Sequence, residues 1–295
     1  MVNRITVSLA VSVVSLLSGS SVWASGGIHA TVIYGEDTRK DLYDVTSSLE
    51  LKLADSTTAV MKASDLTSSG AKTRIASHNF GEEFQLCEDE PFRDQPTAAF
   101  CSASLVAPDL MMTAGHCVVD QDACKQTRFV FGFNVKTRGK YPSEVKTSDV
   151  YSCKSIVRRE QVEAGPDYAL IRLDRPVKGH VPLEISRAGN LSKGDEIMVI
   201  GHPSGIPTKV AGGAHVRDPN PSGYFVANLN TYGGNSGSAV FNSVTGRVEG
   251  ILVRGERDFV QRDSCNVSNH CPLDGCRGED VTKIANVADL IPENR

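Results

Sequence analysis

From Thr97 onward, hydrophobic and polar residues follow the pattern of short β-strands separated by turns. Clusters of Gly, Pro, Asn and Asp, such as Gly165-Pro166-Asp167, interrupt the hydrophobic runs. Many short strands at close spacing are typical of an all-β sandwich or barrel. The expected strands are Thr97–Val106, Arg128–Phe133, Tyr168–Leu173, Glu196–Ile200, Gly223–Leu229, Ser238–Asn242 and Val248–Arg254.

The C-terminal end of the chain has a different periodicity. Its apolar residues recur at helical spacing, which predicts an amphipathic helix packed on the β body. Asp280 is a plausible N-cap for this helix, and Pro292 is expected to end it. The apolar positions are Val281, Ile284, Val287, Ala288 and Ile291.

The N-terminus has the pattern of a targeting segment. A short basic start is followed by the apolar run Ile5–Leu17 and by small residues up to Ala24. This order predicts a secretory signal peptide over residues 1–24 and a secreted or periplasmic mature protein. An uncleaved anchor is the alternative, but the apolar run is shorter than the ~20 residues that a span needs. Residues 25–94 are mixed in character, and we expect them to form either a propeptide or an added part of the body.

The net charge and the cysteine content reduce the number of function classes that the sequence allows. The formal net charge is −4, so the chain lacks the basic footprint of a nucleic-acid-binding protein. The eight cysteines are even in number, and an exported chain meets oxidising conditions, which favours disulfides. Zinc binding by Cys265, His270, Cys271 and Cys276 is an alternative, but their spacing lacks paired C-x-x-C units. We therefore expect no metal and no cofactor.

Ser236 lies in a glycine-rich segment that suits a nucleophile. Residues 234–238 read Gly-Asn-Ser-Gly-Ser. A serine hydroxyl attacks only when a base removes its proton and when fixed donors stabilise the oxyanion that forms. Glycines let the backbone turn sharply, so the N–H groups of Gly234 and Ser236 are candidate oxyanion donors. The alternative interpretation is a glycine-rich hairpin turn that contains serines.

A histidine and an aspartate supply the rest of a possible triad. His116 lies in Thr-Ala-Gly-His-Cys at 113–117, and imidazole can accept and return a proton near neutral pH. Asp167 opens the run Asp-Tyr-Ala-Leu-Ile at 167–171, where a carboxylate can orient the imidazole and stabilise its cation. Taken singly, each has an ordinary alternative: a surface or core histidine, and a turn aspartate.

Together, the three segments resemble the catalytic blocks of the trypsin/chymotrypsin-like serine peptidases, in the family order His, Asp, Ser. The resemblance covers roughly residues 95–260. It implies two Greek-key, six-stranded antiparallel β-barrels with the site between them, and a disulfide between Cys101 and Cys117 beside the histidine. We expect the first barrel over 95–178, the second over 179–262, and a disulfide-rich loop with the C-terminal helix over 263–295.

The chain is most similar to the bacterial glutamyl-endopeptidase (V8-like) branch of this family. Residues 32–39 look like the mature N-terminal segment of that branch, and Gly201-His202-Pro203 looks like its Gly-Tyr-Pro turn. Asn235 stands where the trypsin branch has an aspartate that pairs with the new amino terminus. A neutral amide cannot form that ion pair, so trypsin-type activation is not expected.

The substrate pocket is less well defined by the sequence. The position that is an aspartate in trypsin-like pockets is Asn230, and the strand position that holds a histidine in the glutamyl branch is Leu252. Neutral walls discriminate weakly by shape, which predicts a relaxed preference. Candidate substrate-binding residues are Asn230, Thr231, Leu252, Val253, Arg254 and His215, of which Arg254 or His215 is the possible attractor of an acidic side chain.

These observations predict a secreted, monomeric serine endopeptidase that acts on proteins or peptides and leaves the membrane when its signal is removed. Ser236 is expected to attack, His116 to transfer the proton and Asp167 to orient His116. A non-catalytic homologue that acts as a binding or adhesion module is the alternative from another class. An esterase with the same triad is a third possibility.

Overall fold

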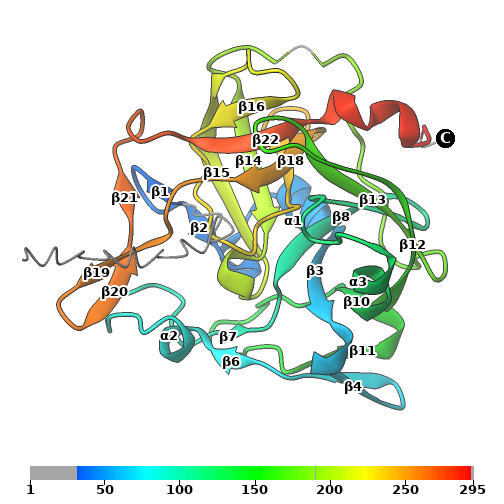
Figure 1. The fold of residues 1–295 in the computed structure, drawn as a ribbon. Helices are drawn as coiled ribbons and strands as arrows, with labels where there is room; N and C mark the ends of the chain where they lie inside the picture. The colour runs from blue at the N-terminus through cyan, green and yellow to red at the C-terminus, as the bar shows by residue number, and fades with distance from the viewer. Residues whose placement is uncertain (1–31, 190, 294–295) are drawn as a thin grey trace, which may run out of the picture.

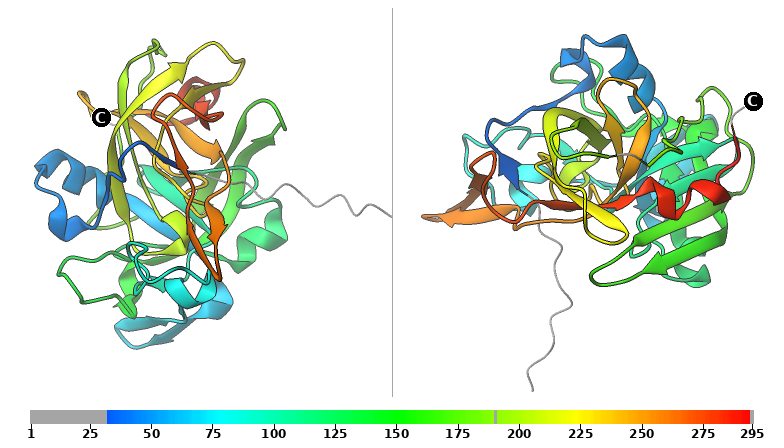
Figure 2. Two further views of the ribbon diagram at one scale, coloured as in Figure 1. Left: turned by 90° about the vertical axis from the view of Figure 1, so that its left-hand side faces the viewer. Right: turned by 90° about the horizontal axis from the view of Figure 1, so that it is seen from above.

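The computed structural model describes residues 32–189 and 191–293. The expected signal peptide over residues 1–24 lies outside the described residues. Two closed barrels dominate the fold, and they pack against each other with smaller sheets and loops around them (Figures 1 and 2).

The first barrel is closed and consists of six antiparallel strands, in the order β10-β12-β13-β9-β8-β3. The pairing of β10 with β3, with Arg128 opposite Met61, completes the ring. The strands are β3 (Thr57–Lys62), β8 (Cys101–Ala107), β9 (Leu110–Thr113), β10 (Thr127–Val130), β12 (Val150–Gln161) and β13 (Asp167–Leu173).

The second barrel also contains six antiparallel strands, in the order β14-β17-β18-β22-β16-β15, and it closes where β14 pairs with β15. The short strand β2 (Arg39–Lys40) extends this sheet by pairing with β15. The prediction of two six-stranded barrels is therefore confirmed. The strands are β14 (Glu196–Gly201), β15 (Lys209–Asp218), β16 (Tyr224–Ala227), β17 (Ala239–Asn242), β18 (Val248–Arg254) and β22 (Glu279–Lys283).

The barrel boundaries differ from those expected from the sequence. β3 belongs to the first barrel although it lies within residues 25–94, which were expected to form a propeptide or an extension. Five of its six residues are buried, so it lacks the alternation that marks a half-exposed strand. At the other end, β22 completes the second barrel beyond residue 262.

The segment that was expected to form a C-terminal helix consists of the end of strand β22 and two 3₁₀ turns. Asp280 and Val281 lie in β22, between β18 and β16, so Asp280 is not a helix cap. Two 3₁₀ turns follow, η5 (Ile284–Asn286) and η6 (Ala288–Leu290). Ile284 and Ile291 are buried in the main apolar core, so the expected packing of this segment on the β body is present.

An apolar core joins the two barrels. The largest cluster of buried side chains includes Leu105 and Met112 from the first barrel and Ile200 and Phe241 from the second. A second cluster, with Val199, Phe225 and Leu252, belongs to the second barrel alone. Because interiors pack as densely as organic crystals, a shared core fixes the relative position of the loops at the junction.

Short elements surround the barrels. One hairpin, β19–β20, projects from the body in both Figure 1 and Figure 2. The helices are α1 (Ser48–Ala54), α2 (Phe80–Glu83) and α3 (Gln121–Gln126), and the other 3₁₀ turns are η1 (Leu42–Asp44), η2 (Ala63–Asp65), η3 (Thr147–Asp149) and η4 (Pro203–Gly205). The other strands are β1 (Ile33–Tyr34), β4 (Leu66–Ser69), β5 (Lys72–Ile75), β6 (His78–Asn79), β7 (Pro96–Thr97), β11 (Glu144–Lys146), β19 (Phe259–Arg262), β20 (Cys265–Ser268) and β21 (His270–Cys271).

All eight cysteines are paired. Because Cys265, Cys271 and Cys276 are oxidised, the alternative zinc site at the C-terminal end is excluded. Within the described residues, no helix has the length and apolarity needed to cross a bilayer. The pairs are Cys87–Cys265, Cys101–Cys117, Cys124–Cys153 and Cys271–Cys276.

Candidate active site

The structure brings His116 and Asp167 into direct contact at the end of the first barrel. β9 and β13 are antiparallel neighbours, with Thr113 opposite Ala169, so the loop after β9 lies beside the start of β13. The Nδ1 atom of His116 is 2.7 Å from Oδ2 of Asp167. The other carboxylate oxygen accepts the N–H groups of Gly115 and His116, at 2.6 and 3.2 Å. One carboxylate therefore fixes both the imidazole and the backbone that carries it.

The carboxyl group of Asp167 is held in its charged form. Its side chain is only 2% exposed, and this burial alone would raise its pKa. The hydrogen bond and the charge interaction with His116, together with the two backbone donors, outweigh burial and keep the pKa of Asp167 below 3.8. A carboxylate that stays ionised can stabilise a positive imidazolium next to it.

The backbone of Asp167 is bonded to the second barrel. The Thr282 hydroxyl, on β22, accepts the N–H of Asp167 and donates to its carbonyl, both at 3.0 Å. Both residues are buried, so these bonds are protected from water. Thr282 therefore sets the position of the first-barrel carboxylate relative to the second barrel.

The loop that carries Ser236 lies directly against the first barrel. The carbonyl of Ser236 accepts the N–H of Ser102, on β8, at 2.8 Å. A Cβ atom on Gly237 would meet Oγ1 of Thr113 at 2.2 Å and the N atom of Ala114 at 3.0 Å, so a glycine is required where the two loops meet. The Cys101–Cys117 disulfide joins β8 to the loop of His116 in the same region.

The backbone at Gly234 is suited to presenting amide groups. Gly234 has a φ of +91°, and a Cβ there would lie 2.6 Å from the carbonyl of His202, so only glycine fits. Its carbonyl accepts the Ser102 hydroxyl at 2.9 Å. Among the described residues, the N–H groups of Gly234 and Ser236 donate to no protein acceptor. Both amides are thus available to an incoming oxyanion.

His202 supports this loop from behind. It is fully buried, and burial lowers its pKa to about 3, so the ring is neutral. Nδ1 lies 3.1 Å from the carbonyl of Ile206, and the His202 N–H donates to the Ser102 hydroxyl. The Gly201-His202-Pro203 turn therefore packs against Gly234 and supports the backbone there; it is not part of a proton relay.

Asn235 is buried and makes a local contact. Its Oδ1 accepts the hydroxyl of Ser238 at 3.3 Å, and a Cβ on Gly201 would lie 2.6 Å from the same oxygen. Asn235 offers a neutral amide here, so it supplies no charge for an ion pair with a new amino terminus. The expected absence of trypsin-type activation stays a prediction.

Asn230 holds the N-terminal segment. Its Oδ1 accepts the N–H of Tyr34 at 2.7 Å, and its Nδ2 donates to the carbonyl of Glu36 at 2.6 Å and to the hydroxyl of Thr38 at 3.2 Å. The side chain is therefore already fully engaged. Residues 34–38 are therefore bound to Asn230, which stands at the sequence position of the charged residue in trypsin-like pockets.

Thr231 contacts a buried acid that the sequence analysis missed. Its hydroxyl donates to Glu279 at 3.1 Å, and the same carboxyl group accepts the N–H of Glu256 at 3.3 Å. Complete burial raises the pKa of Glu279 well above 4.5. Glu279 was overlooked because the end of the chain was interpreted as a helix rather than as the strand β22.

The two candidate cationic residues are both engaged elsewhere. Arg254 donates to Asp280 at 3.0 Å and to the carbonyls of Val162 and Gly165, and its side chain is 13% exposed. His215 lies 3.2 Å from the side-chain nitrogen of Asn228 and 3.5 Å from the carboxylate of Asp274. Neither offers an unpaired positive charge beside Ser236.

Leu252 and Val253 are buried in the central strand β18, beside the loop of Ser236. The Leu252 carbonyl accepts the N–H of Gly237 at 2.8 Å, and its N–H donates to Ser238 at 2.9 Å. Both side chains are about 1% exposed. Leu252 therefore positions the Ser236 loop through its backbone.

Thr282 was also missed by sequence reasoning. Its signal was present but masked: the polar residues Asp280 and Thr282 flank Val281, and so short a run fits a buried strand as well as a helix.

The sulfurs of Cys101 and Cys117 lie within 4.8 Å of a His116 ring nitrogen, but the disulfide removes both as thiolate ligands. This arrangement is suited to acid–base chemistry and not to metal binding.

Two closed antiparallel barrels, with a His–Asp pair and a glycine-rich serine loop at their junction, define a chymotrypsin-like fold. The model of the trypsin-like peptidase domain family matches residues 101–251, more than half of the chain. The chain therefore belongs to this family, as its sequence motifs predicted.

Two solved structures illustrate the similarity. A Glu endopeptidase, solved in complex with MPD, is 16% identical, with 88% of this chain and 97% of that chain covered and a TM-score of 0.49. An inactive form of Rv3671c from Mycobacterium tuberculosis H37Rv is 12% identical, with 88% and 94% covered and a TM-score of 0.46. No curated protein sequence matches the chain.

Proposed function

We propose that the mature protein is a secreted or periplasmic serine endopeptidase with the triad Ser236, His116 and Asp167. The observation that carries this proposal is the contact between Asp167 and His116. The Asp167 carboxylate binds Nδ1 of His116 at 2.7 Å and accepts two backbone N–H groups of the same loop. A buried aspartate so placed selects the tautomer in which Nε2 can accept a proton.

The proposed mechanism uses only residues of this chain. Ser236 Oγ attacks the scissile carbonyl while His116 takes its proton and later returns it to the leaving amine. The N–H groups of Gly234 and Ser236 bind the oxyanion of the tetrahedral intermediate. The acyl-enzyme is then hydrolysed by water, which His116 activates in the same way.

We propose a relaxed primary specificity. Asn230 is saturated by residues 34–38, Arg254 is paired with Asp280, and Leu252 is apolar. Neutral walls reject poorly fitting side chains by shape, by about 1–3 kcal/mol per methylene. Substrates are thus expected to be proteins or peptides without a strict charge requirement at the cleaved bond.

The decisive experiment is active-site labelling of the secreted protein. A fluorophosphonate probe should label the parent and a Ser222→Ala control, which alters an exposed turn serine, but not the Ser236→Ala variant. Casein hydrolysis should follow the same pattern. Absence of labelling in a folded parent would favour the non-catalytic binding module. Cleavage of esters without cleavage of peptides would favour an esterase.

A further inference from the structure

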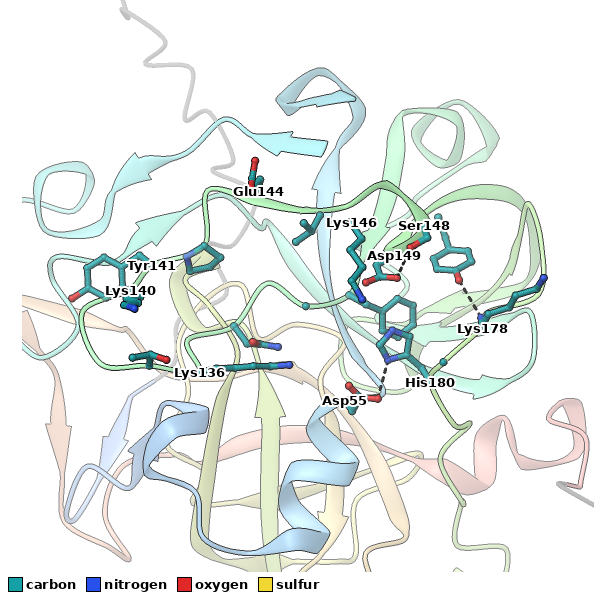
Figure 3. Close-up of a pocket in the computed structure, with 18 of the residues that line it drawn as sticks. Asp55, Lys136, Lys140, Tyr141, Glu144, Lys146, Ser148, Asp149, Lys178 and His180 are labelled. Atoms are coloured by element: carbon teal, nitrogen blue, oxygen red, sulfur yellow. Dashed lines mark hydrogen bonds and ion pairs between the residues drawn. The ribbon is translucent and has the colours of Figure 1, made fainter. Parts of the chain in front are cut away.

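A broad depression of about 1120 Å³ opens at one end of the first barrel (Figure 3). It is lined by residues of the loop after β10, by β11 with the turn η3, and by the segment after β13. β13 runs from Asp167 to Leu173, and the first residue after it that lines the depression is Arg175. At ~3.3 Å per residue, this strand separates the depression from the triad by about 20 Å. The depression is therefore distinct from the candidate active site.

The floor of the depression is aromatic and ordered by an ion pair. The ring of His180 stacks on the buried ring of Phe131, with centroids 4.1 Å apart. Nδ1 of His180 lies 2.9 Å from a carboxylate oxygen of Asp55 (Figure 3). The hydroxyl of Tyr151 accepts the backbone N–H of Lys178 at 3.2 Å and fixes the far wall. The floor is preformed.

The rim is positively charged, although the chain as a whole carries a formal charge of −4. Lys136, Lys140 and Lys146 are exposed, and none forms an ion pair with any residue in the described part of the chain. Figure 3 shows Lys146 extending from β11 toward the His180 ring, with Lys136 on the opposite side near Asp55. The lining contains five Lys or Arg side chains and three carboxylates. The charge of Lys136 helps to lower the pKa of Asp55, but no hydrogen bond or ion pair in the described residues holds these three amines, so they can pair with a ligand.

The distribution of charge indicates what kind of anion fits. Three carboxylates, of Asp55, Glu144 and Asp149, also line the depression; Asp55 is paired with His180 and Glu144 with Lys72. A polymer with a charge on every unit, such as a nucleic acid, would meet these carboxylates as well as the lysines. An extended peptide with spaced acidic side chains can place each carboxylate against a lysine and its apolar groups on the floor. The volume also exceeds the ~300–1000 Å³ of a typical small-ligand pocket.

We propose that this depression binds an acidic, extended segment of the protein substrate, with Lys136 and Lys146 facing its carboxylates. The assignment to a substrate rests on the proposed peptidase function. A segment held about 20 Å from the cleaved bond raises the effective concentration of that bond at the triad. Substrates too short to reach the depression gain nothing from it.

The binding step is tested without catalysis, in full-length mature protein carrying Ser236→Ala. The probe is a fluorescein-labelled peptide of alternating Glu and Ser, and the Gln–Ser peptide is the neutral control. Anisotropy should report binding of the acidic peptide that weakens as salt rises from ~50 to ~200 mM. The double variant Lys136→Glu/Lys146→Glu should weaken binding by about tenfold, in line with exposed charge pairs of modest strength.

Lys154→Glu is the matched control, because Lys154 is an exposed lysine of the same barrel outside the depression. It should bind like the parent. Equal binding of the parent and the double variant, or no binding at ~50 mM salt, would overturn the proposal. Binding of heparin but not of the acidic peptide would also overturn it, because the occupant would then be a polysaccharide.

The link to catalysis is tested with active protein. A short neutral peptide substrate should be cleaved equally by the parent and the double variant. The same substrate extended by a distal acidic segment should show a lower KM with the parent only, with kcat unchanged. Failure to cleave the short peptide would count against the peptidase function alone, since the binding measurement does not depend on it. Equal KM values for both proteins on the extended substrate would overturn the substrate assignment.

Discussion

The guanidinium group of Arg39 lies 4.0 Å from the ring centroid of Tyr232, and this contact joins the N-terminal segment to the loop of the candidate nucleophile. Arg39 is buried and binds Asp37 through two nitrogens, at 2.8 and 2.7 Å. Tyr232 precedes Gly234 by two residues. The segment that contains β2 is thus part of the scaffold of the candidate active site.

Replacement of this arginine should destabilise the fold. In Arg39→Met, Asp37 loses its partner, although its 23%-exposed side chain can still be hydrated, and Tyr232 loses its cation. We expect the free energy of unfolding to fall by about 1.5–3 kcal/mol, as for the loss of hydrogen bonds to a charged group. Urea denaturation of the Ser236→Ala form, which avoids autolysis, measures it. Arg262→Met, at an exposed pair with Asp89, should cause little change. Equal stability of both variants would contradict the structural role of Arg39.

The two hydrogen bonds of Thr282 should matter for stability and for activity. Thr282→Val keeps the shape but leaves the N–H and carbonyl of Asp167 without these partners. Each unsatisfied buried group costs about 1–3 kcal/mol, so unfolding should become easier by that order. The specific activity should fall as well, because Asp167 orients His116. Thr282→Ser retains the hydroxyl and should restore both properties. If Thr282→Ser lost as much stability and activity as Thr282→Val, the methyl group of Thr282 rather than its hydroxyl would be the important group.

The charge of Asp167 should be essential to turnover. Asp167→Asn keeps the size of the side chain but cannot favour the required tautomer or stabilise the imidazolium. We expect kcat on a peptide substrate at neutral pH to fall by roughly 10⁴-fold. Asp174→Asn, at an exposed carboxylate just beyond the other end of β13, provides the control. A loss of less than about tenfold in Asp167→Asn would argue against the triad.

The His180–Asp55 pair should make stability depend on pH. Burial opposes the charge of His180, but the hydrogen bond and charge of Asp55 prevail and raise its pKa above 6.5. The pair's contribution is therefore fully present below pH 6.5 and is lost as pH rises through the raised pKa. Because the Asp55 carboxylate is half exposed, we expect at most about 1 kcal/mol.

Melting curves of the parent and of His180→Gln test this dependence. The difference in stability between the two proteins should shrink from about pH 6 to about pH 9. His78→Gln, at an exposed histidine, should show no such trend. A difference that stays constant or grows with rising pH would contradict the assignment.

Local patterns in the sequence predicted a β-sandwich or barrel and the three candidate catalytic segments, and the resemblance carried by those segments implied the two barrels. The residues around His116, Asp167 and Ser236 have short, specific patterns, and the turns between strands are marked by Gly and Pro. β3 and β22 were not recognised, because burial on both sides removes the alternation of polar and apolar residues. In β22, Glu279 and Thr282 are polar yet buried, and their partners lie on distant segments. Such pairings exist only in three dimensions, so a periodicity rule cannot find them.

The position of β22 also has a consequence for synthesis of the chain. All six strands of the first barrel have been made once Leu173 is reached, so this barrel can close early. The second barrel has a gap between β18 and β16 until residues 279–283 emerge from the ribosome. Nascent chains would thus carry a finished half beside an open one whose unpaired edges invite association with other chains. Proteolytic cleavage just before Glu279 would separate a central strand of the second barrel from the rest of the chain, not a peripheral C-terminal segment.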